Sequence, residues 1–459
     1  MKKISKLLGL TTIVLSCGLV SCSSSDVDEN LGETKTVVNM LSTPQPIQLT
    51  EEQKVFVTDN NHFTLNFIKT VNDEYPYRTG ESFIFSPLSI TFVLGMVNDG
   101  AVGQTEQEIE QTLGFHKGGI KAVNEYCKNL IDNLPKVDED VTLNIANAIF
   151  LNKQYTLKPQ FEQDMKEYYD AKAEALDFSS PETLGHINNW CDKKTKGMIP
   201  TILDEVKPNM ASYLLNAIYF KADWTSKFDP KNTTTETFTS EAGYSDLLNP
   251  PHMFTYELPM MHQNVLINYA KSDICSSINL PFGNGMWYMT IMLPEEGKTT
   301  YDIINNLRWG LNYVHSYSRT RGTDDIYFNP FSPHEVDLKL PRFETSSDTD
   351  DLKINLKDGL ADVMKKMGIH LAFDEIQAEI PNMCNLPVFI KMMRQKAKII
   401  VNEEGSEAAA VTVAGMMEKS AVGPRDYPKA TFHANRSFVY VIREASSGVI
   451  LFVGKFTGA

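Results

Sequence analysis

The chain lacks the short motifs that mark many enzymes and metal proteins. It has no GxSxG nucleophile elbow, no P-loop, no glycine-rich dinucleotide fingerprint and no CxxC pair. His334-Glu335 begins like a zinc-protease motif, but Leu338 stands where the second histidine would be. The nine histidines are scattered singly. The sequence therefore predicts that the protein is not an enzyme and holds no metal.

Positive charge is also scarce. The chain has 43 lysines and arginines against 58 aspartates and glutamates, a net charge of −15. Nonspecific binding of nucleic acid requires a basic surface. We therefore expect no nucleic-acid partner.

Cysteines are few and widely spaced. Beyond the N-terminal leader there are four, with no metal-site spacing: Cys127, Cys191, Cys275 and Cys384. We expect buried thiols. An oxidising compartment would also permit disulfides, and that alternative stays open here.

The N-terminal segment has the pattern of an export signal. Three lysines within the first six residues precede an apolar run over residues 7–20, which is too short to span a bilayer. The run ends in LVSC, which resembles a bacterial lipobox with Cys22 as the acylated residue; Cys17 is a weaker competitor because it shortens the run. We predict a signal peptide over residues 1–21 and a lipid anchor in the bacterial outer membrane. The protein would face the periplasm or the cell surface.

One domain is expected after this leader. Residues 22–49 are polar and read as a flexible tether. Thr50 and Gln53 then have the spacing of a capping box at a helix start. Helical patterns dominate to about residue 135, and apolar strand patterns follow at 146–151, 214–220, 438–442 and 449–453. No second linker follows, so we predict a single α+β domain over residues 50–459.

Several blocks of sequence, in order, resemble the serpin family. The first is FSPLSI at residues 85–90. The others are GA at 100–101, LGF at 113–115, NAIYFKADW at 216–224, MMH at 260–262, LPF at 280–282, LPRF at 340–343, VNEEGSEAAA at 401–410 and FVGK at 452–455. The resemblance implies three β-sheets with eight or nine helices and a metastable native state. It also implies an exposed reactive-centre loop over about residues 403–431.

The function that the resemblance implies is irreversible inhibition of serine endopeptidases, with cysteine endopeptidases as a further target class. In serpins the target cleaves the loop and becomes a covalent acyl-enzyme. The loop then inserts as a new central strand into the largest sheet and drags the enzyme along. The partners would be the target endopeptidases and, through the lipid anchor, the membrane, with a monomeric chain and no cofactor. The alternatives are a non-inhibitory serpin acting as a binding protein and a plain protease substrate.

The loop itself suits insertion into a sheet. Its hinge consists of Glu403, Glu404, Gly405, Ser406, Ala408, Ala409 and Ala410. Gly405 supplies backbone freedom. Side chains alternate between the two faces of a strand. Every second residue from Ser406 onward is small or apolar, apart from Thr412, and these residues would share one face. Glu407 falls on the other face. Proline could not donate to a central ladder, and none occurs from residue 401 to residue 423.

The reactive bond is expected at Lys419-Ser420. In the family the cut usually lies about 14 residues beyond the hinge glycine, and a lysine there suits a trypsin-like protease. Met416 and Met417 are alternatives for elastase-like, chymotrypsin-like or subtilisin-like enzymes. Arg425 is a further trypsin-like alternative, although cutting there would leave slack in the loop.

Two polar clusters are implied by the resemblance. Where the central strands separate, the expected cluster is Ser86, Ser89, Asn216 and Gln395, with glutamine in place of the histidine that many serpins carry. At the top of the sheet, the expected cluster is Trp224, Arg342 and Glu403, with a salt bridge between the last two. A basic run, Lys391, Arg394, Lys396 and Lys398, resembles polyanion sites, but we predict no cofactor.

Overall fold

The computed structural model describes residues 41–74, 81–241, 254–308, 326–327, 331–354, 356–406 and 426–458. These residues hold eight α-helices: α1 (Glu51–Glu74), α2 (Pro87–Gly100), α3 (Gly103–Leu113), α4 (Gly119–Asn133), α5 (Pro159–Tyr169), α6 (Glu182–Lys194), α7 (Thr300–Asn306) and α8 (Leu360–Met367). Over the described ranges, none of them has both the length and the apolar character needed to cross a membrane. Four short 3-10 helices lie between them: η2 (Leu134–Lys136), η3 (Pro230–Asn232), η4 (Thr349–Ile354) and η5 (Leu371–Phe373).

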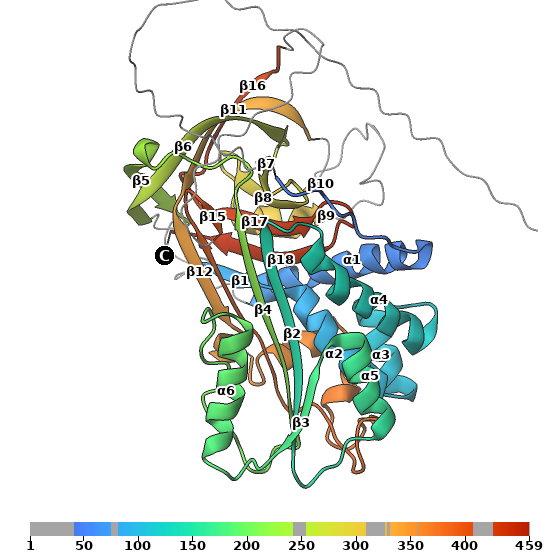
Figure 1. The fold of residues 1–459 in the computed structure, drawn as a ribbon. Helices are drawn as coiled ribbons and strands as arrows, with labels where there is room; N and C mark the ends of the chain where they lie inside the picture. The colour runs from blue at the N-terminus through green and yellow to red at the C-terminus, as the bar shows by residue number, and fades with distance from the viewer. Residues whose placement is uncertain are drawn as a thin grey trace, which may run out of the picture. The chain divides into compact units, whose positions relative to one another are not determined.

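One sheet has seven strands, and its long strands run vertically through the middle of Figure 1. Its strands, in spatial order, are β12 (Phe343–Asp348), β14 (Lys396–Val401), β15 (Gly405–Ser406), β4 (Ser212–Asp223), β2 (Val141–Asn152) and β3 (Lys172–Leu176), with β13 (Met393–Arg394) also paired to β4. The predicted apolar runs at 146–151 and 214–220 lie inside β2 and β4, which pair over all but the last residue of each strand. These two strands form one side of the site described below.

A second sheet has nine strands. Its path is β1 (Phe83–Phe85), β18 (Ile450–Phe456), β17 (Phe438–Glu444), β8 (Trp287–Pro294), β7 (Cys275–Phe282), β6 (Phe254–Lys271), β11 (Ser332–Pro341) and β16 (Lys429–His433), with β5 (Thr234–Ser240) beside β6. The strand patterns predicted at 438–442 and 449–453 correspond to β17 and β18, which pair in an antiparallel ladder. The short strands β9 (Leu307–Arg308) and β10 (Ile326–Tyr327) form a separate parallel pair.

This architecture confirms the predicted α+β fold and falls within the expected count of helices. The hinge residues lie in the seven-stranded sheet, whereas the nine-stranded sheet is the larger in the described ranges. The reason is that one hydrogen-bonded path joins strands on both sides of β7 and β8 into a single large sheet.

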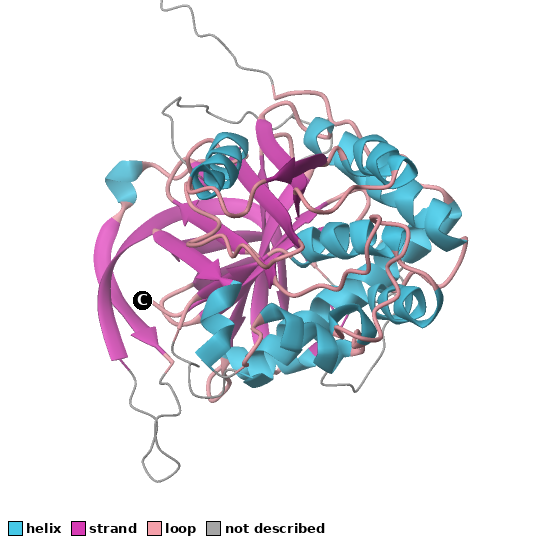
Figure 2. Ribbon diagram, turned by 90° about the horizontal axis from the view of Figure 1, so that it is seen from below, coloured by secondary structure: helices cyan, strands magenta, loops and turns pink. Residues whose placement is uncertain are grey.

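The two faces of the seven-stranded sheet pack differently. One face belongs to the main core, to which β4 contributes Leu214, Ile218 and Phe220. The other face packs against α6 through Tyr213, Leu215 and Ala217, because side chains alternate along a strand. In Figure 1, β2 and β4 accordingly run between α6 and the group of α2 and α5. Figure 2 shows most helices gathered beside the strands.

The domain begins earlier than expected. Ile47 is buried, its backbone N–H donates to Ser446 Oγ at 3.0 Å, and Ser42 Oγ donates to Asp138 at 2.9 Å. Residues 42–49 therefore pack on the domain, and the expected tether to residue 49 is too long. The predicted capping box does form: Gln53 N–H donates to Thr50 Oγ1 at 3.1 Å, and Thr50 N–H donates to Gln53 Oε1 at 3.2 Å.

Candidate functional site

The central feature of the site is a seam in the seven-stranded sheet, the line along which β4 faces β13 and β14. At one end the hinge strand β15 lies between the two sides, with Ser406 opposite both Ala222 of β4 and Val401 of β14. At the other end β13 pairs directly with β4, Met393 with Leu214 and Arg394 with Leu215. In the described ranges, no strand pairs with residues 216–221 of β4 along this line.

The hinge is fixed by close backbone contact. Gly405 has φ +150°, and a Cβ on it would lie 2.1 Å from the carbonyl oxygen of Ala222. Only glycine fits such an approach, so the role of Gly405 goes beyond the freedom of bending that its sequence context suggests. Ser406 is 1% exposed, and its Oγ donates to the Phe220 carbonyl at 3.3 Å. Gly405 and Ser406 are thus part of the sheet.

A charged cluster covers the hinge at the top of the sheet. Arg342 Nε lies 2.8 and 2.7 Å from the two carboxylate oxygens of Glu403, and Thr233 Oγ1 donates to the same carboxylate. Burial of Glu403 tends to raise its pKa, but the hydrogen bonds from Arg342 and Thr233 outweigh this and lower the pKa from its ordinary value. The carboxylate is therefore held in its charged form at neutral pH.

Trp224 connects this cluster to the sheet. Its indole N–H donates to the Asn402 carbonyl at 2.9 Å, and its backbone N–H donates to the Glu404 carbonyl at 2.7 Å. Its ring stacks on Phe282 with the centroids 4.2 Å apart. The structure thus brings together Trp224 and the Arg342–Glu403 pair, the residues that the sequence places there.

Sequence reasoning missed Thr233, which donates to Glu403, and also Lys227. Lys227 Nζ lies 2.6 Å from Glu404 and 2.8 Å from Asp223. This ion pair joins the hinge to the end of β4. The only signal in the sequence is that Lys227 lies four residues after Asp223, and this spacing does not predict a contact with Glu404.

The polar cluster below the hinge is only partly connected. Gln395 exchanges two hydrogen bonds with the backbone of Ser86, at 2.9 and 2.7 Å, and Ser89 Oγ donates to Ser86 Oγ at 3.0 Å. Asn216 instead donates to Asn147 at 2.7 Å. Ser89, Asn216 and Gln395 nevertheless line one small cavity under the seam. Glutamine thus makes both a donor and an acceptor contact at this position.

One atom of this cavity lacks a partner. The Oδ1 atom of Asn216 is buried and accepts no hydrogen bond from the described residues. An unpaired buried acceptor is costly and rare in native proteins. It marks a place at which a donor from elsewhere would be stabilising.

Several predicted residues lie outside the described ranges. These are the reactive-bond candidates Lys419, Ser420, Met416, Met417 and Arg425, the hinge residues Ala408, Ala409 and Ala410, and the lipidation residue Cys22. The described chain resumes at residue 426, and β16 pairs in parallel with β11. The two described ends of the loop are therefore each anchored in a different sheet.

The basic run does not form an open positive patch. Lys396 lies 3.3 Å from Asp348, Lys398 lies 2.6 Å from Glu344, and Arg394 pairs with several carboxylates. Lys391 lies over the ring of Phe389. Three of the four cations are therefore matched by acidic neighbours. No group of three metal-binding side chains occurs in the described part of the chain.

The four cysteines of the domain are free and buried. Burial raises the pKa of the Cys127 and Cys191 thiols to about 12. These thiols are neutral and unreactive at physiological pH. They offer no nucleophile.

Comparison with known proteins gives a consistent result. The family model described as "Serpin (serine protease inhibitor)" matches residues 58–458. Serpin B6 of Macaca fascicularis is 29% identical over 408 residues, covering 88% of this chain and 99% of its own. The human leukocyte elastase inhibitor is 28% identical, covering 87% and 98%. The structure of human thyroxine-binding globulin with its thyroxine ligand superposes with a TM-score of 0.67 at 26% identity, over 88% of this chain and 98% of that one.

Proposed function

The chain belongs to the serpin family, and from this premise we propose that it inhibits serine endopeptidases by inserting its cleaved loop into the seam. The observation that carries the proposal is the position of the hinge. Gly405 and Ser406 already occupy the first two places of a strand between β4 and β14. The next residues need only continue a register that is already set.

The register has a specific consequence for Thr412. Continued one for one from Ser406, it puts Thr412 opposite Asn216 on β4 and Gln395 on β14. The side chain would point into the small cavity where Asn216 Oδ1 lacks a donor. The threonine hydroxyl supplies that donor. The cavity thus has the chemistry to receive this loop residue.

The charge pattern also supports insertion. Ser406 faces the main core together with Ala222, so Ala408 and Ala410 would follow it onto that buried face. Glu407 would lie on the opposite face, beside the half-buried Lys221 of β4. A buried unpaired carboxylate would oppose insertion, whereas one beside a lysine does not.

For the reactive bond we propose Lys419-Ser420, which implies a trypsin-like target. Ser406 to Lys419 spans 14 residues. At about 3.3 Å per residue, full insertion moves the acyl-enzyme by about 45 Å. An enzyme held there is pulled across the inhibitor while still covalently bound, and cysteine endopeptidases, which also form acyl-enzymes, are a second target class. The chain acts as a monomer in this scheme.

The test is a denaturing gel of the wild-type chain with trypsin. An inhibitor gives a covalent band that resists SDS, together with a minor nicked product. A catalytically dead trypsin with its active-site serine replaced is the control and should give neither. A fully nicked chain with no covalent band would show a plain substrate and refute the proposal.

A second candidate function is a binding protein. The observation that favours it is the similarity to thyroxine-binding globulin, whose solved structure is a complex with thyroxine. The same gel separates the two candidates, because a protein that only binds small molecules forms no covalent band. The small, alanine-rich hinge favours the inhibitor.

We also propose that the chain is exported and anchored by lipid at Cys22 in the outer membrane. Acylation would bury methylene groups in the bilayer and hold the domain at its surface. Labelling cells with an alkyne fatty acid should mark the wild-type chain and not Cys22→Ser, while Cys17→Ser keeps the label. Protease treatment of intact cells then distinguishes the cell surface from the periplasm.

A further inference from the structure

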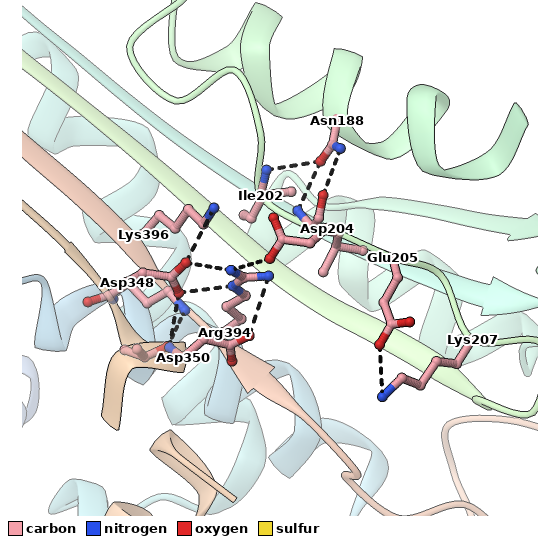
Figure 3. A network of polar contacts seen from close by, with 12 residues as sticks. Asn188, Ile202, Asp204, Glu205, Lys207, Asp348, Asp350, Arg394 and Lys396 are labelled. Carbon is pink, nitrogen blue, oxygen red and sulfur yellow. Dashed lines mark hydrogen bonds and ion pairs between the residues drawn. The ribbon is translucent and has the colours of Figure 1, made fainter. Parts of the chain in front are cut away.

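Arg394 places a positive charge at the end of the seam where β13 pairs directly with β4. It lies on β13, directly opposite Leu215 of β4, and its side chain is only 6% exposed. Three carboxylates surround the guanidinium group, as Figure 3 shows. Nη2 lies 2.8 Å from Asp204 and 2.5 Å from Asp348, and Nη1 lies 3.5 Å from Asp350. Such a buried cation is stable only when it is paired.

Two of these carboxylates lie on the same side of the seam as Arg394. Asp348 ends β12, which pairs with β14 opposite Lys396, and Asp350 follows in η4. Burial opposes ionisation of Asp348, but the hydrogen bonds from Arg394 prevail and lower its pKa. If the seam widens, Arg394, Asp348 and Asp350 move together as one body.

Asp204 belongs to the other side. It lies in the connection between α6 and β4, and the α6 residue Asn188 holds the two residues before it. Asn188 Oδ1 accepts from the backbone N–H groups of Ile202 and Leu203, both at 2.9 Å, and its Nδ2 donates to the Leu203 carbonyl at 2.8 Å. Ile202 and Leu203 are buried in the cluster that α6 forms with β4. Asp204 is therefore tied to β4, and its bond to Arg394 crosses the seam.

We infer that the Arg394–Asp204 ion pair is a latch: it holds the seam closed at the end where β13 pairs with β4, and it sets the rate at which the loop completes its insertion. This inference rests on the proposed function. The register that begins at Ser406 puts residues 413 and 414 opposite Arg394 and Met393, where β13 now pairs directly with β4. A new strand there separates the two sides by a further 4.7–4.9 Å or so. The 2.8 Å ion pair cannot span that gap, so it breaks in the same step as the β13–β4 pairing.

The latch is weak enough to open during inhibition. The side chain of Asp204 is 66% exposed, so solvent screens its attraction to Arg394. Exposed pairs of this kind change an equilibrium or a rate by up to about five-fold. Replacing Asp204 by asparagine leaves Arg394 with Asp348 and Asp350, and no buried charge loses all its partners. The variant should therefore fold.

The chain offers a matched control. Asp350→Asn removes a carboxylate from the same guanidinium group but on the near side of the seam, where no contact breaks on opening. Glu205→Gln removes a neighbouring surface charge that pairs with Lys207 at 3.0 Å rather than with Arg394. Both controls keep the Arg394–Asp204 pair.

The experiment measures hydrogen–deuterium exchange in the intact full-length variants, with no protease present. We expect peptides covering residues 212–217 and 390–396 to exchange about two- to five-fold faster in Asp204→Asn, while both controls match the wild type. Equal exchange in Asp204→Asn and the wild type overturns the latch. So does an equal rise in Asp350→Asn, because the effect would then be loss of charge around Arg394 and not opening of the seam.

A second readout separates failure of the latch from failure of the proposed function. Wild-type chain nicked in its loop is heated beside intact chain. A gain in heat resistance shows that the loop inserts, whatever the exchange data show. No gain overturns the proposed function and, with it, the role of the latch in insertion, even where exchange shows that Asp204 holds the seam.

Discussion

Ser406 is already paired with β4 and β14 in the intact chain, so its replacement by arginine should displace the hinge from the sheet, and insertion must then bury the charge. Ser406 is 1% exposed and faces the main core beside Ala222 and Phe220. Arginine stays charged in proteins. Among the described residues, Ser406 bonds to the Phe220 carbonyl and pairs with Ala222 and Val401, none of which carries a carboxylate. An unpaired buried charge costs about 3–5 kcal/mol. At 1.36 kcal/mol per factor of ten, insertion should slow by about 150- to 5,000-fold.

The assay is the yield of covalent complex with trypsin. Insertion competes with hydrolysis of the acyl-enzyme, so a slowed loop releases active trypsin and leaves a nicked chain. We expect Ser406→Arg to be cleaved at Lys419 at the wild-type rate but to trap almost no enzyme. Ser406→Thr, which keeps a small side chain and its hydroxyl, is the control and should trap normally. Trapping by Ser406→Arg at the wild-type yield would refute the hinge argument.

Four further predictions follow from the same geometry. Lys419→Ala should lower trypsin inhibition by about a hundredfold, since the primary pocket of trypsin selects a cation; a small change in the inhibition rate would move the reactive bond elsewhere. Gly405→Ala should destabilise the intact chain by about 1–3 kcal/mol in a guanidinium titration, because its Cβ would clash with a β4 carbonyl; an unchanged midpoint would contradict the docked hinge. Glu403→Gln should lower the melting temperature at pH 7. The pKa of Glu403 is lower in the folded chain than in the unfolded chain. Its contribution to stability is therefore present above the unfolded pKa and is lost as the pH falls through the folded pKa. The melting temperatures of the variant and the wild type should converge in acid, and a difference that stays constant with pH would contradict this. Thr412→Val should reduce the extra stability of the nicked chain by about 1–3 kcal/mol, because Asn216 again lacks a donor; equal melting of the two nicked chains would count against this register.

Much of the fold could be predicted from the sequence because its signals are local patterns or sequence blocks that follow one another in a fixed order. The Thr50–Gln53 capping box depends on four consecutive residues, and both of its hydrogen bonds form. The apolar runs of β17 and β18 are separated by a short turn, so their antiparallel pairing follows from local chain geometry. The pair of Arg342 and Glu403 could be expected only through the family resemblance, because nothing local links residues 61 positions apart.

Long-range contacts explain what the sequence could not show. Arg394 looked like part of a basic run, but its partner Asp204 comes from a distant connection that only the packing of α6 places there. The polar residues 42–49 looked like linker, yet Ile47 is buried against the domain. The role of Gly405 in close backbone approach depends on Ala222, and no pattern around residue 405 reports that neighbour.

The most direct test of the whole account is the thermal unfolding of the chain after a single cut in its loop. If the loop continues from Ser406 as a strand between β4 and β14, the nicked chain gains a full set of ladder hydrogen bonds and must melt well above the intact chain. A nicked chain that melts at or below the temperature of the intact chain would contradict the account.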